Sequence, residues 1–245
     1  MVHNLKTILQ AANSRWANAV NILLPPRCVL CGQPSGSICI CEPCKNDLPW
    51  AEPQCYQCGL PLPAGHGKTC GQCVQSPPSF QHTVSPLQYR FPADQLVRAL
   101  KFHRQLAEGR VLSHLMCTHI IAEGSTLPDM LIPVPLHHLR MLKRGFNQAC
   151  ELGNYASRRL GIPLLATGLR RKRNTRAQSG LSRKQRRSNV RGAFYWRGGK
   201  RPGRHVALID DVMTTGTTVS ECARVLKEAG ARRVDVWVPT RAVPK

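Results

Sequence analysis

The chain has 245 residues, of which 42% are apolar and 20% charged, so a wholly disordered protein is excluded. Its 35 lysines and arginines outnumber its 13 aspartates and glutamates, and the net charge of +22 indicates polyanionic or phosphorylated partners. No apolar run approaches the roughly 18 residues needed to cross a bilayer, and the N-terminus does not resemble a signal peptide. We therefore expect a basic cytoplasmic protein with no membrane span.

The N-terminal residues 1–24 are predicted to form a helix, because apolar residues recur at helical spacing over residues 5–24. Such a helix either packs on the module that follows it or anchors the chain to a partner or a membrane surface. Only Lys6 and Arg15 are basic in this stretch, which favours packing.

Cysteine and charge divide the remaining chain near residue 80. Nine of the twelve cysteines lie between Cys28 and Cys73, whereas residues 85–245 carry 30 basic and ten acidic residues. The Pro-Pro pair at 77–78 fits a short linker at this changeover. These opposite gradients predict a cysteine module over residues 25–80 and a second domain over residues 85–245.

Eight cysteines form four Cys-X-X-Cys pairs, here called knuckles. The two-residue gap lets both thiolates of a knuckle face one ion, and two knuckles complete a tetrahedral Zn²⁺ site. A disulfide framework is the alternative, which a reducing compartment disfavours. Four cysteines can fill each site, so we expect two structural zinc ions. Their ligands are Cys28, Cys31, Cys41, Cys44, Cys55, Cys58, Cys70 and Cys73.

The pairing of the knuckles is a separate question. Sequential pairing joins the first two knuckles in one site and the last two in another, which gives two small zinc ribbons, whereas interleaved pairing is the alternative. The nine- and eleven-residue loops of the sequential scheme close easily, so we favour it. Cys39 is left over, and we expect it to bind no metal.

In the second domain, apolar runs of strand length alternate with helical patterns. Apolar spacing predicts a helix from Leu96 to Leu115 with a break near His103. The run at 130–136 predicts a buried strand whose prolines place its end at the rim of a sheet. Residues 147–160 predict a further helix, which Gly161 closes in a left-handed conformation.

The last part of the chain is predicted to form a strand at 205–210, a helix at 217–229 that Gly230 ends, and a strand at 233–239. A strand, a helix and a strand in this order form a parallel crossover. The predicted fold class is therefore α/β with a largely parallel sheet.

The turn between the strand at 205–210 and the next helix carries the clearest chemistry. The strand presents Asp210 and Asp211 at its carboxyl end, where α/β sheets bind ligands. The helix N-terminus favours a phosphate, and the two carboxylates can accept hydrogen bonds from the hydroxyls of an attached sugar. In the alternative, the turn has a purely structural role and Thr217 is the N-cap of the helix, but this would explain only one of the four threonine hydroxyls in the turn. The turn consists of Val212, Met213, Thr214, Thr215, Gly216, Thr217 and Thr218.

The segment ALIDDVMTTGTT resembles the loop that binds 5-phosphoribosyl-1-pyrophosphate (PRPP) in type I phosphoribosyltransferases. With the cysteine knuckles, the chain resembles the ComF/GntX family, in which a double zinc-ribbon module precedes a type I phosphoribosyltransferase-like domain. Further matching residues are the runs Leu131-Ile-Pro-Val-Pro-Leu136 and Arg144-Gly-Phe-Asn-Gln148, and the spaced residues Arg171, Thr175, Gln178, Leu181, Arg186, Asn189 and Phe194.

The resemblance implies roles for these residues. Asp210 and Asp211 would form the catalytic pair and hold the ribose 2- and 3-hydroxyls, while the turn at 212–218 wraps the 5-phosphate. Mg²⁺ would bridge pyrophosphate and ribose oxygens. The pyrophosphate loop and a closing hood over residues 171–191 would contribute Arg140, Lys143, Arg144, Arg171, Thr175, Gln178 and Arg186.

The segment at 169–204 supplies fourteen lysines and arginines, and no acid occurs between Glu151 and Asp210. It is a solvated charge run, a hood that neutralises pyrophosphate, or a contact for nucleic-acid phosphates. PRPP needs only a few positive groups, so direct binding of single- or double-stranded DNA stays open as an added role. Aromatic residues are scarce here, which favours backbone contact over base readout.

Two functions remain open. The first is a Mg²⁺-dependent phosphoribosyltransferase in which a nitrogen nucleophile attacks C1 of PRPP and the protein supplies positioning and charge stabilisation. The second is a non-catalytic module that senses PRPP or a nucleotide and docks DNA or a DNA-uptake helicase through its hood and zinc module. The resemblance implies a link to competence and DNA uptake in either case.

Overall fold

The computed structural model describes residues 26–51, 53–63, 65, 67–173, 189–199 and 201–243. Contacts divide the chain into two units, Met1–Asp47 and Leu48–Lys245, with the boundary between the second and third knuckles. The helix predicted within residues 1–24 lies outside the described residues. The domain bounds 25–80 and 85–245 stay a prediction.

The first unit is described from Pro26 and consists of tight turns and one short helix, α2 (Glu42–Asn46). The first knuckle closes through a hydrogen bond of 2.8 Å from the Cys28 N–H to the Gln33 carbonyl. Gly32 has a φ of +74°, in the left-handed region that glycine adopts without strain. A unit of this size buries little apolar surface, so it depends on its cysteines for stability.

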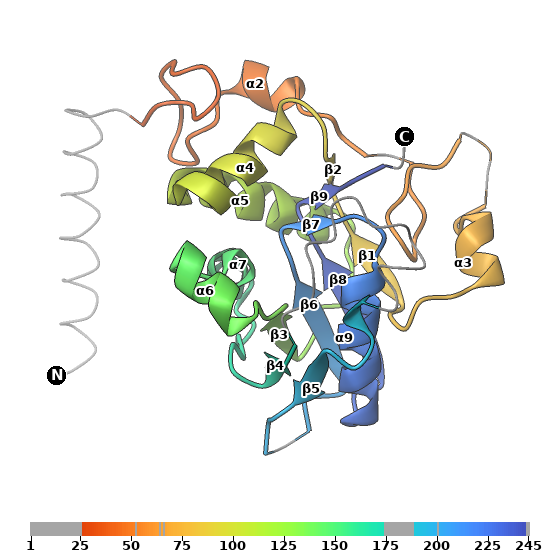
Figure 1. Ribbon diagram of the computed structural model, residues 1–245. Coiled ribbons are helices and arrows are strands. Elements are labelled where there is room, and N and C mark those ends of the chain that lie inside the picture. Colours follow the sequence, from red (N-terminus) through yellow and green to blue (C-terminus); the bar gives the residue numbers. More distant parts are fainter. Residues whose placement is uncertain are drawn as a thin grey trace, which may run out of the picture. The chain divides into compact units, whose positions relative to one another are not determined.

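The second unit is built on a parallel sheet of four strands with the order β1-β8-β6-β3 (Figure 1). Helix α9 (Thr217–Glu228) connects β6 to β8, which pair in parallel from His205–Arg233 to Ile209–Trp237. The predicted parallel crossover is thereby confirmed. The strands are β1 (His82–Val84), β8 (Arg233–Trp237), β6 (His205–Ile209) and β3 (Met130–Pro133).

Three of these strands break at the same level and resume as a smaller parallel sheet with the order β2-β9-β7. The resumed strands are β2 (Leu87–Gln88), β9 (Thr240–Arg241) and β7 (Val212–Met213). In β6 the break falls at Asp210 and Asp211, so the paired acids occupy the point where the strand leaves the main sheet.

The helices of the second unit cover both faces of the main sheet. Figure 1 shows α5 (Leu106–Ala122) and α7 (Gln148–Leu160) on one side and α9 on the other. Helix α4 (Ala93–His103) ends where Arg104 adopts a φ of +54°, which confirms the break expected near His103. The other helices that the structure describes in this unit include α3 (Gly71–Gln75) and α6 (His138–Arg144).

The structure corrects two strand predictions and adds a hairpin. The strands expected at 130–136 and 233–239 end at Pro133 and Trp237, short of Pro135 and Pro239, which have no N–H to donate. The added hairpin lies within the basic segment at 169–204 and pairs β4 (Leu169–Arg171) with β5 (Phe194–Trp196) antiparallel.

A buried ionic cluster links β6 and β8. Asp235 is 2% exposed and accepts hydrogen bonds from His205 Nε2 at 2.7 Å and from Arg233 Nε at 3.0 Å. Burial acts to raise the pKa of Asp235, but the His205 and Arg233 hydrogen bonds outweigh it and hold the pKa below its ordinary value. The ionised carboxylate therefore stabilises the folded state.

We predict that Asp235→Asn lowers the free energy of unfolding at pH 7 by about 3 kcal/mol, because it removes one partner of a buried ionic cluster. A carboxylate whose pKa is lowered by folding stabilises the folded state. This stabilisation is complete above the unfolded-state pKa of about 3.9, and it is lost as the pH falls through the pKa of the folded state. Urea unfolding of the wild type and of Asp235→Asn should therefore show that the difference between their free energies of unfolding becomes smaller below pH ~4.

The exposed carboxylate of Glu228, on the last turn of α9, provides the matched control. Glu228→Gln should change the free energy of unfolding by less than about 0.5 kcal/mol. A gap between wild type and Asp235→Asn that does not depend on pH would contradict the assigned role of Asp235.

Candidate functional site

The paired acids at the end of β6 lie against a lysine from α4. Asp211 is 6% exposed, and its Oδ2 forms an ion pair with Lys101 Nζ at 2.9 Å. Its backbone carbonyl accepts a hydrogen bond of 3.1 Å from the Thr240 hydroxyl. Lys101 was missed in the sequence, because a lysine on an amphipathic helix gives no signal of a partner more than a hundred residues away.

Asp210 is the less compensated of the two acids. Its Oδ1 accepts a hydrogen bond of 2.9 Å from the Asp211 N–H. Burial, and then the charge of Asp211, raise the pKa of Asp210 to about 7, while Lys101 opposes this shift. The pair therefore offers oxygen acceptors with surplus negative charge, which suits sugar hydroxyls and hard cations such as Mg²⁺.

The turn after β7 opens α9 without a side-chain cap. Gly216 is the N-cap residue, with a φ of +72° in the left-handed region, and no side chain caps the helix. The alternative in which Thr217 is the N-cap is therefore wrong. The hydroxyls of Thr215 and Thr217 lie 2.7 Å apart, so the turn gathers hydroxyl groups at the positive end of a twelve-residue helix.

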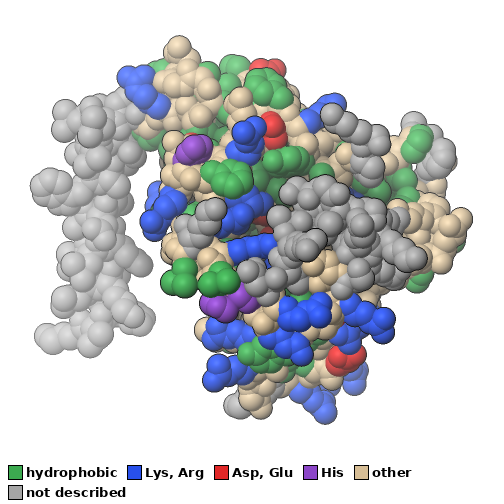
Figure 2. Space-filling view, viewed as in Figure 1, with side chains coloured by type: hydrophobic (Ala, Val, Ile, Leu, Met, Phe, Trp, Pro, Cys, Tyr) green, Lys and Arg blue, Asp and Glu red, His purple; other side chains and the backbone are tan. Residues whose placement is uncertain are grey.

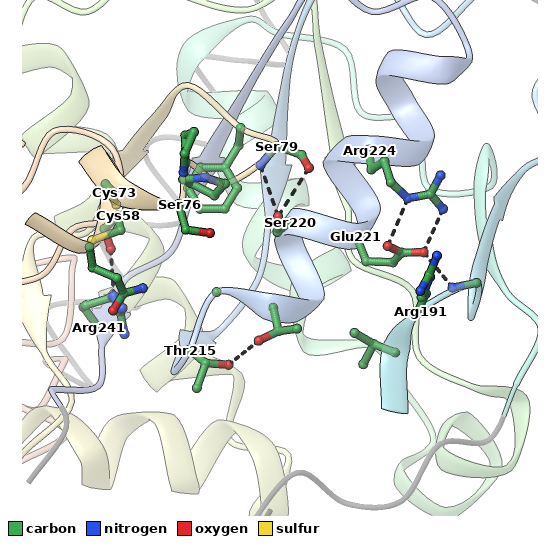
Figure 3. Close-up of a pocket in the computed structure, with 18 residues that line it drawn as sticks. Cys58, Cys73, Ser76, Ser79, Arg191, Thr215, Ser220, Glu221, Arg224 and Arg241 are labelled. Carbon is green, nitrogen blue, oxygen red and sulfur yellow. Dashed lines mark hydrogen bonds and ion pairs between the residues drawn. The ribbon is translucent and has the colours of Figure 1, made fainter. Parts of the chain in front are cut away.

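A pocket of about 760 Å³ opens beside this turn (Figure 3). Its walls come from the Thr215–Thr217 turn, from α9, from residues 76–80 and from the last two knuckles. Glu221 on α9 accepts a hydrogen bond of 2.7 Å from the Gly192 N–H and pairs with Arg224 at 2.8 Å. Residues 190–192 of the basic segment are thereby fixed at the rim of the pocket.

Two of the predicted basic residues lie within electrostatic reach of one another. Burial lowers the pKa of Arg171, the charge of Arg140 lowers it further, and the charge of Asp210 opposes them. Arg144 lies near the same group, because burial and then the charge of Arg144 lower the pKa of Arg140. Arg144 also donates to Gln148 Oε1 at 3.2 Å, and its guanidinium lies 5.8 Å from the centre of the Phe102 ring. Outside the described residues lie the Lys143 side chain and Thr175, Gln178 and Arg186.

The cysteine knuckles form two clusters in which all four Sγ atoms lie within 4.8 Å of one another. The first cluster is Cys28, Cys31, Cys41 and Cys44, and the second cluster is Cys55, Cys58, Cys70 and Cys73. Sequential pairing is thereby confirmed, and Cys39 belongs to neither cluster. Four cysteine sulfurs are the donor set of a closed structural zinc site.

The second cluster shows why a cation is needed. Burial, and then the charge of Cys55, act to raise the pKa of Cys58 to about 11. Four thiolates this close together repel one another, and a bound Zn²⁺ offsets that repulsion. The cluster also packs against Leu60 and Leu62, so binding of the metal stabilises a small apolar core.

Arg241 on β9 joins the second cluster to the turn, and it was also missed in the sequence. It is 3% exposed, and its Nε donates to the Cys58 carbonyl at 2.7 Å. Its Nη1 donates to the carbonyls of Met213 at 2.9 Å and Thr214. A lone arginine near the C-terminus gave no signal of a role.

Comparison with known proteins identifies both parts of the chain. Residues 19–74 match the double zinc ribbon domain and residues 147–242 match the phosphoribosyl transferase domain. Competence protein F of Haemophilus influenzae is 36% identical over 83% of this chain and 90% of its own length. DNA utilization protein YhgH of Escherichia coli O157:H7 is 36% identical over 91% of this chain and 100% of its own length. The chain belongs to the ComF/GntX family.

Membership of the ComF/GntX family agrees with the architecture. The predicted α/β fold with a parallel sheet and an N-terminal zinc-ribbon module is confirmed by the two domain matches, the sheet topology and the two clusters. The Bacillus subtilis glutamine PRPP amidotransferase complexed with ADP and GMP aligns at 21% identity and a TM-score of 0.40, over 60% of this chain and 30% of that chain. Among the described residues, no helix has the length and apolar character needed to span a membrane.

We predict two zinc ions per chain by elemental analysis of the purified protein. Cys31→Ser and Cys73→Ser should each lose about one equivalent of zinc, because each leaves three sulfur ligands in one cluster. Cys39→Ser is the matched control and should keep both ions. A protein that contains no zinc, or a Cys39→Ser variant that loses an ion, would contradict this ligand assignment.

Proposed function

We propose that this chain binds PRPP together with Mg²⁺ at the turn between β6 and α9, in the cytoplasm, and that this binding serves the uptake or use of DNA. One observation carries the proposal: Asp210 and Asp211 stand at the carboxyl end of β6, and β7 and a short turn lead from them to an uncapped helix that a left-handed Gly216 opens. Membership of a family whose relatives are named competence protein F and DNA utilization protein YhgH supports the link to DNA.

The geometry suits the parts of PRPP in order. The carboxylates of Asp210 and Asp211 accept hydrogen bonds from the ribose 2- and 3-hydroxyls. The N–H groups and hydroxyls of Thr214–Thr218 hold the 5-phosphate at the N-terminus of α9, where the helix dipole favours an anion. Arg140 and Arg171 then neutralise the pyrophosphate, because guanidinium groups match phosphate oxygens in pairs.

Magnesium fits the same place. The two carboxylates provide hard oxygen donors, and the pKa of Asp210, raised to about 7 by burial and by the charge of Asp211, marks negative charge that a cation would offset. When bound, Mg²⁺ would supply charge neutralisation for the departing pyrophosphate. Lys101, paired with Asp211, holds that carboxylate in position.

Phosphoribosyl transfer is the reaction that this arrangement supports. A nitrogen nucleophile replaces pyrophosphate at C1 through an oxocarbenium-like state, and the chain contributes positioning and charge stabilisation. In the alternative, PRPP or a nucleotide is a signal, and the chain docks DNA or a DNA-uptake helicase. Release of pyrophosphate from PRPP with candidate amines and bases distinguishes turnover from sensing.

Basic charge favours contact with DNA as a second function. Lys and Arg side chains gather around the part of the second unit that carries β4 and β5 (Figure 2). The hairpin itself holds Arg170 and Arg171, with Lys172 and Arg173 directly after it. The segment at 169–204 contains fourteen lysines and arginines and no acid, so its charge suits a phosphate backbone.

We predict that calorimetric titration of PRPP with Mg²⁺ into the wild type shows micromolar binding. The double variant Asp210→Asn/Asp211→Asn should lose this binding, because neutral amides replace both carboxylate acceptors. Glu228→Gln is the control, since it neutralises an acid at the far end of α9. Thermal unfolding of all three proteins separates a lost site from a lost fold. Absence of wild-type binding would overturn the proposed site.

We further predict that DNA binding depends strongly on salt. Replacing Arg183, Lys184, Arg186 and Arg187 by Gln should flatten the slope of log K against log salt by about 0.9 for each DNA phosphate that these side chains neutralise in the wild type. The control replaces four exposed arginines on α4, α5 and α7, namely Arg98, Arg110, Arg158 and Arg159. An unchanged slope in the first variant, or equal changes in both, would remove the basic segment from the DNA interface.

A further inference from the structure

The buried guanidinium of Arg241 lies between the second cluster and the turn at 214–218, here called the 5-phosphate turn because it would hold the 5-phosphate of PRPP. Figure 3 shows Arg241 beside Cys58 and Cys73, with the hydrogen bond to Cys58 drawn. From one side chain, hydrogen bonds reach the carbonyls of Cys58, Met213 and Thr214. A metal-ligating residue and two residues of the β7 turn are therefore held by the same group.

The charge of Arg241 matches what a zinc ion would create. Each acceptor named above is a backbone carbonyl, which leaves the positive charge of Arg241 without a carboxylate among these contacts. Four thiolates around one Zn²⁺ carry a net negative charge. The loaded cluster and the buried guanidinium therefore stabilise each other.

On the side of the turn, Arg241 helps to orient two peptide groups, of which the Met213 carbonyl also accepts a hydrogen bond of 2.9 Å from the Ala242 N–H. The C=O and N–H of a trans peptide point in opposite directions. Hydrogen bonds from Arg241 to the carbonyls of Met213 and Thr214 therefore direct the N–H groups of Thr214 and Thr215 away from the guanidinium. These two N–H groups belong to the turn that would hold the 5-phosphate.

On the side of the cluster, the third knuckle is packed tightly on β1. The Thr83 hydroxyl donates to the Gln57 carbonyl at 2.7 Å, and the rings of Tyr56 and His82 stack at 4.1 Å. A Cβ on Gly59 would lie only 3.1 Å from Thr83 Cγ2, so the knuckle approaches the strand as closely as glycine allows. The knuckle is therefore held closely against β1, and its Cys58 carbonyl is the group that contacts Arg241.

We propose that Arg241 is a positioning residue that couples the second cluster to the 5-phosphate turn, so that zinc at this cluster and PRPP at the turn strengthen each other's binding. The proposal rests on the PRPP site proposed above. Coupling of two binding equilibria is reciprocal. Bound PRPP thus slows zinc loss from the second cluster, and loss of that zinc weakens PRPP binding. The first cluster belongs to the other unit and serves as the internal reference.

The test follows release of zinc from the full chain to a chromogenic chelator, with and without PRPP and Mg²⁺. In the wild type, one zinc should leave about 10-fold more slowly when PRPP is bound, and the other should leave at an unchanged rate. Cys41→Ser and Cys70→Ser, which each empty one cluster, assign the two phases.

Arg241→Met, which keeps the length of the side chain and removes its donors, should keep both zinc ions and lose the effect of PRPP. Its affinity for PRPP should fall about 10-fold, and Arg241→Lys, which keeps the charge with fewer donors, should restore part of it. Arg232→Met removes an exposed arginine just before β8 and should behave as the wild type.

The outcomes separate the two proposals. The coupling is overturned, and the PRPP site stays intact, if the wild type binds PRPP without any change in the rate of zinc release. The same holds if PRPP slows zinc release from Arg241→Met as much as from the wild type. Absence of PRPP binding overturns both. If Arg241→Met does not fold, the comparison of Cys70→Ser with Cys41→Ser decides, because only Cys70→Ser should weaken PRPP binding.

Discussion

The parallel pairing of β6 with β8 is the constraint on which the second unit depends. It aligns both strands from His205 to Ile209, and it brings the break in β6 level with the break in β8. At that level β6 releases Asp210 and Asp211, and β8 continues into Thr240 and Arg241, which fasten the acids and the turn from behind. The site is therefore assembled at a shared interruption of the sheet, where backbone groups leave the ladder and become available to a ligand.

Two kinds of stabilisation act on this protein. The larger unit buries an apolar core around its sheet, whereas the cysteine clusters concentrate sulfur in segments that contain few large apolar side chains. Metal binding replaces core burial in such small modules, so their stability follows zinc and pH rather than packing alone. The second cluster combines both, since its cysteines pack against Leu60 and Leu62 and its knuckle packs on β1.

Local patterns in the sequence were sufficient for most of the fold. The helix end at Gly161 was found because glycine favours the left-handed conformation, and the break near His103 was found from the apolar spacing. The cysteine clusters were found because spacing alone determines which thiols can meet. Lys101 and Arg241 were missed for the opposite reason, because their partners are set by tertiary contacts. The hairpin of β4 and β5 was missed because three-residue strands rich in arginine and aromatic residues show no clear alternation.

The hairpin of β4 and β5 also determines how the basic segment meets its ligands. Its register joins Arg171 to Phe194, so the chain between them is a closed loop that begins and ends at one place. Arg171 lies within electrostatic reach of Asp210, and the Gly192 N–H donates a hydrogen bond to Glu221. Both ends of the loop therefore lie next to the candidate site. Because the loop is closed, the positive side chains at its two ends have a high effective concentration near the site, whatever the concentration of the protein. In the proposed PRPP complex, Arg171 and Arg191 at the described ends of this loop would therefore be positive charges tethered beside the phosphate.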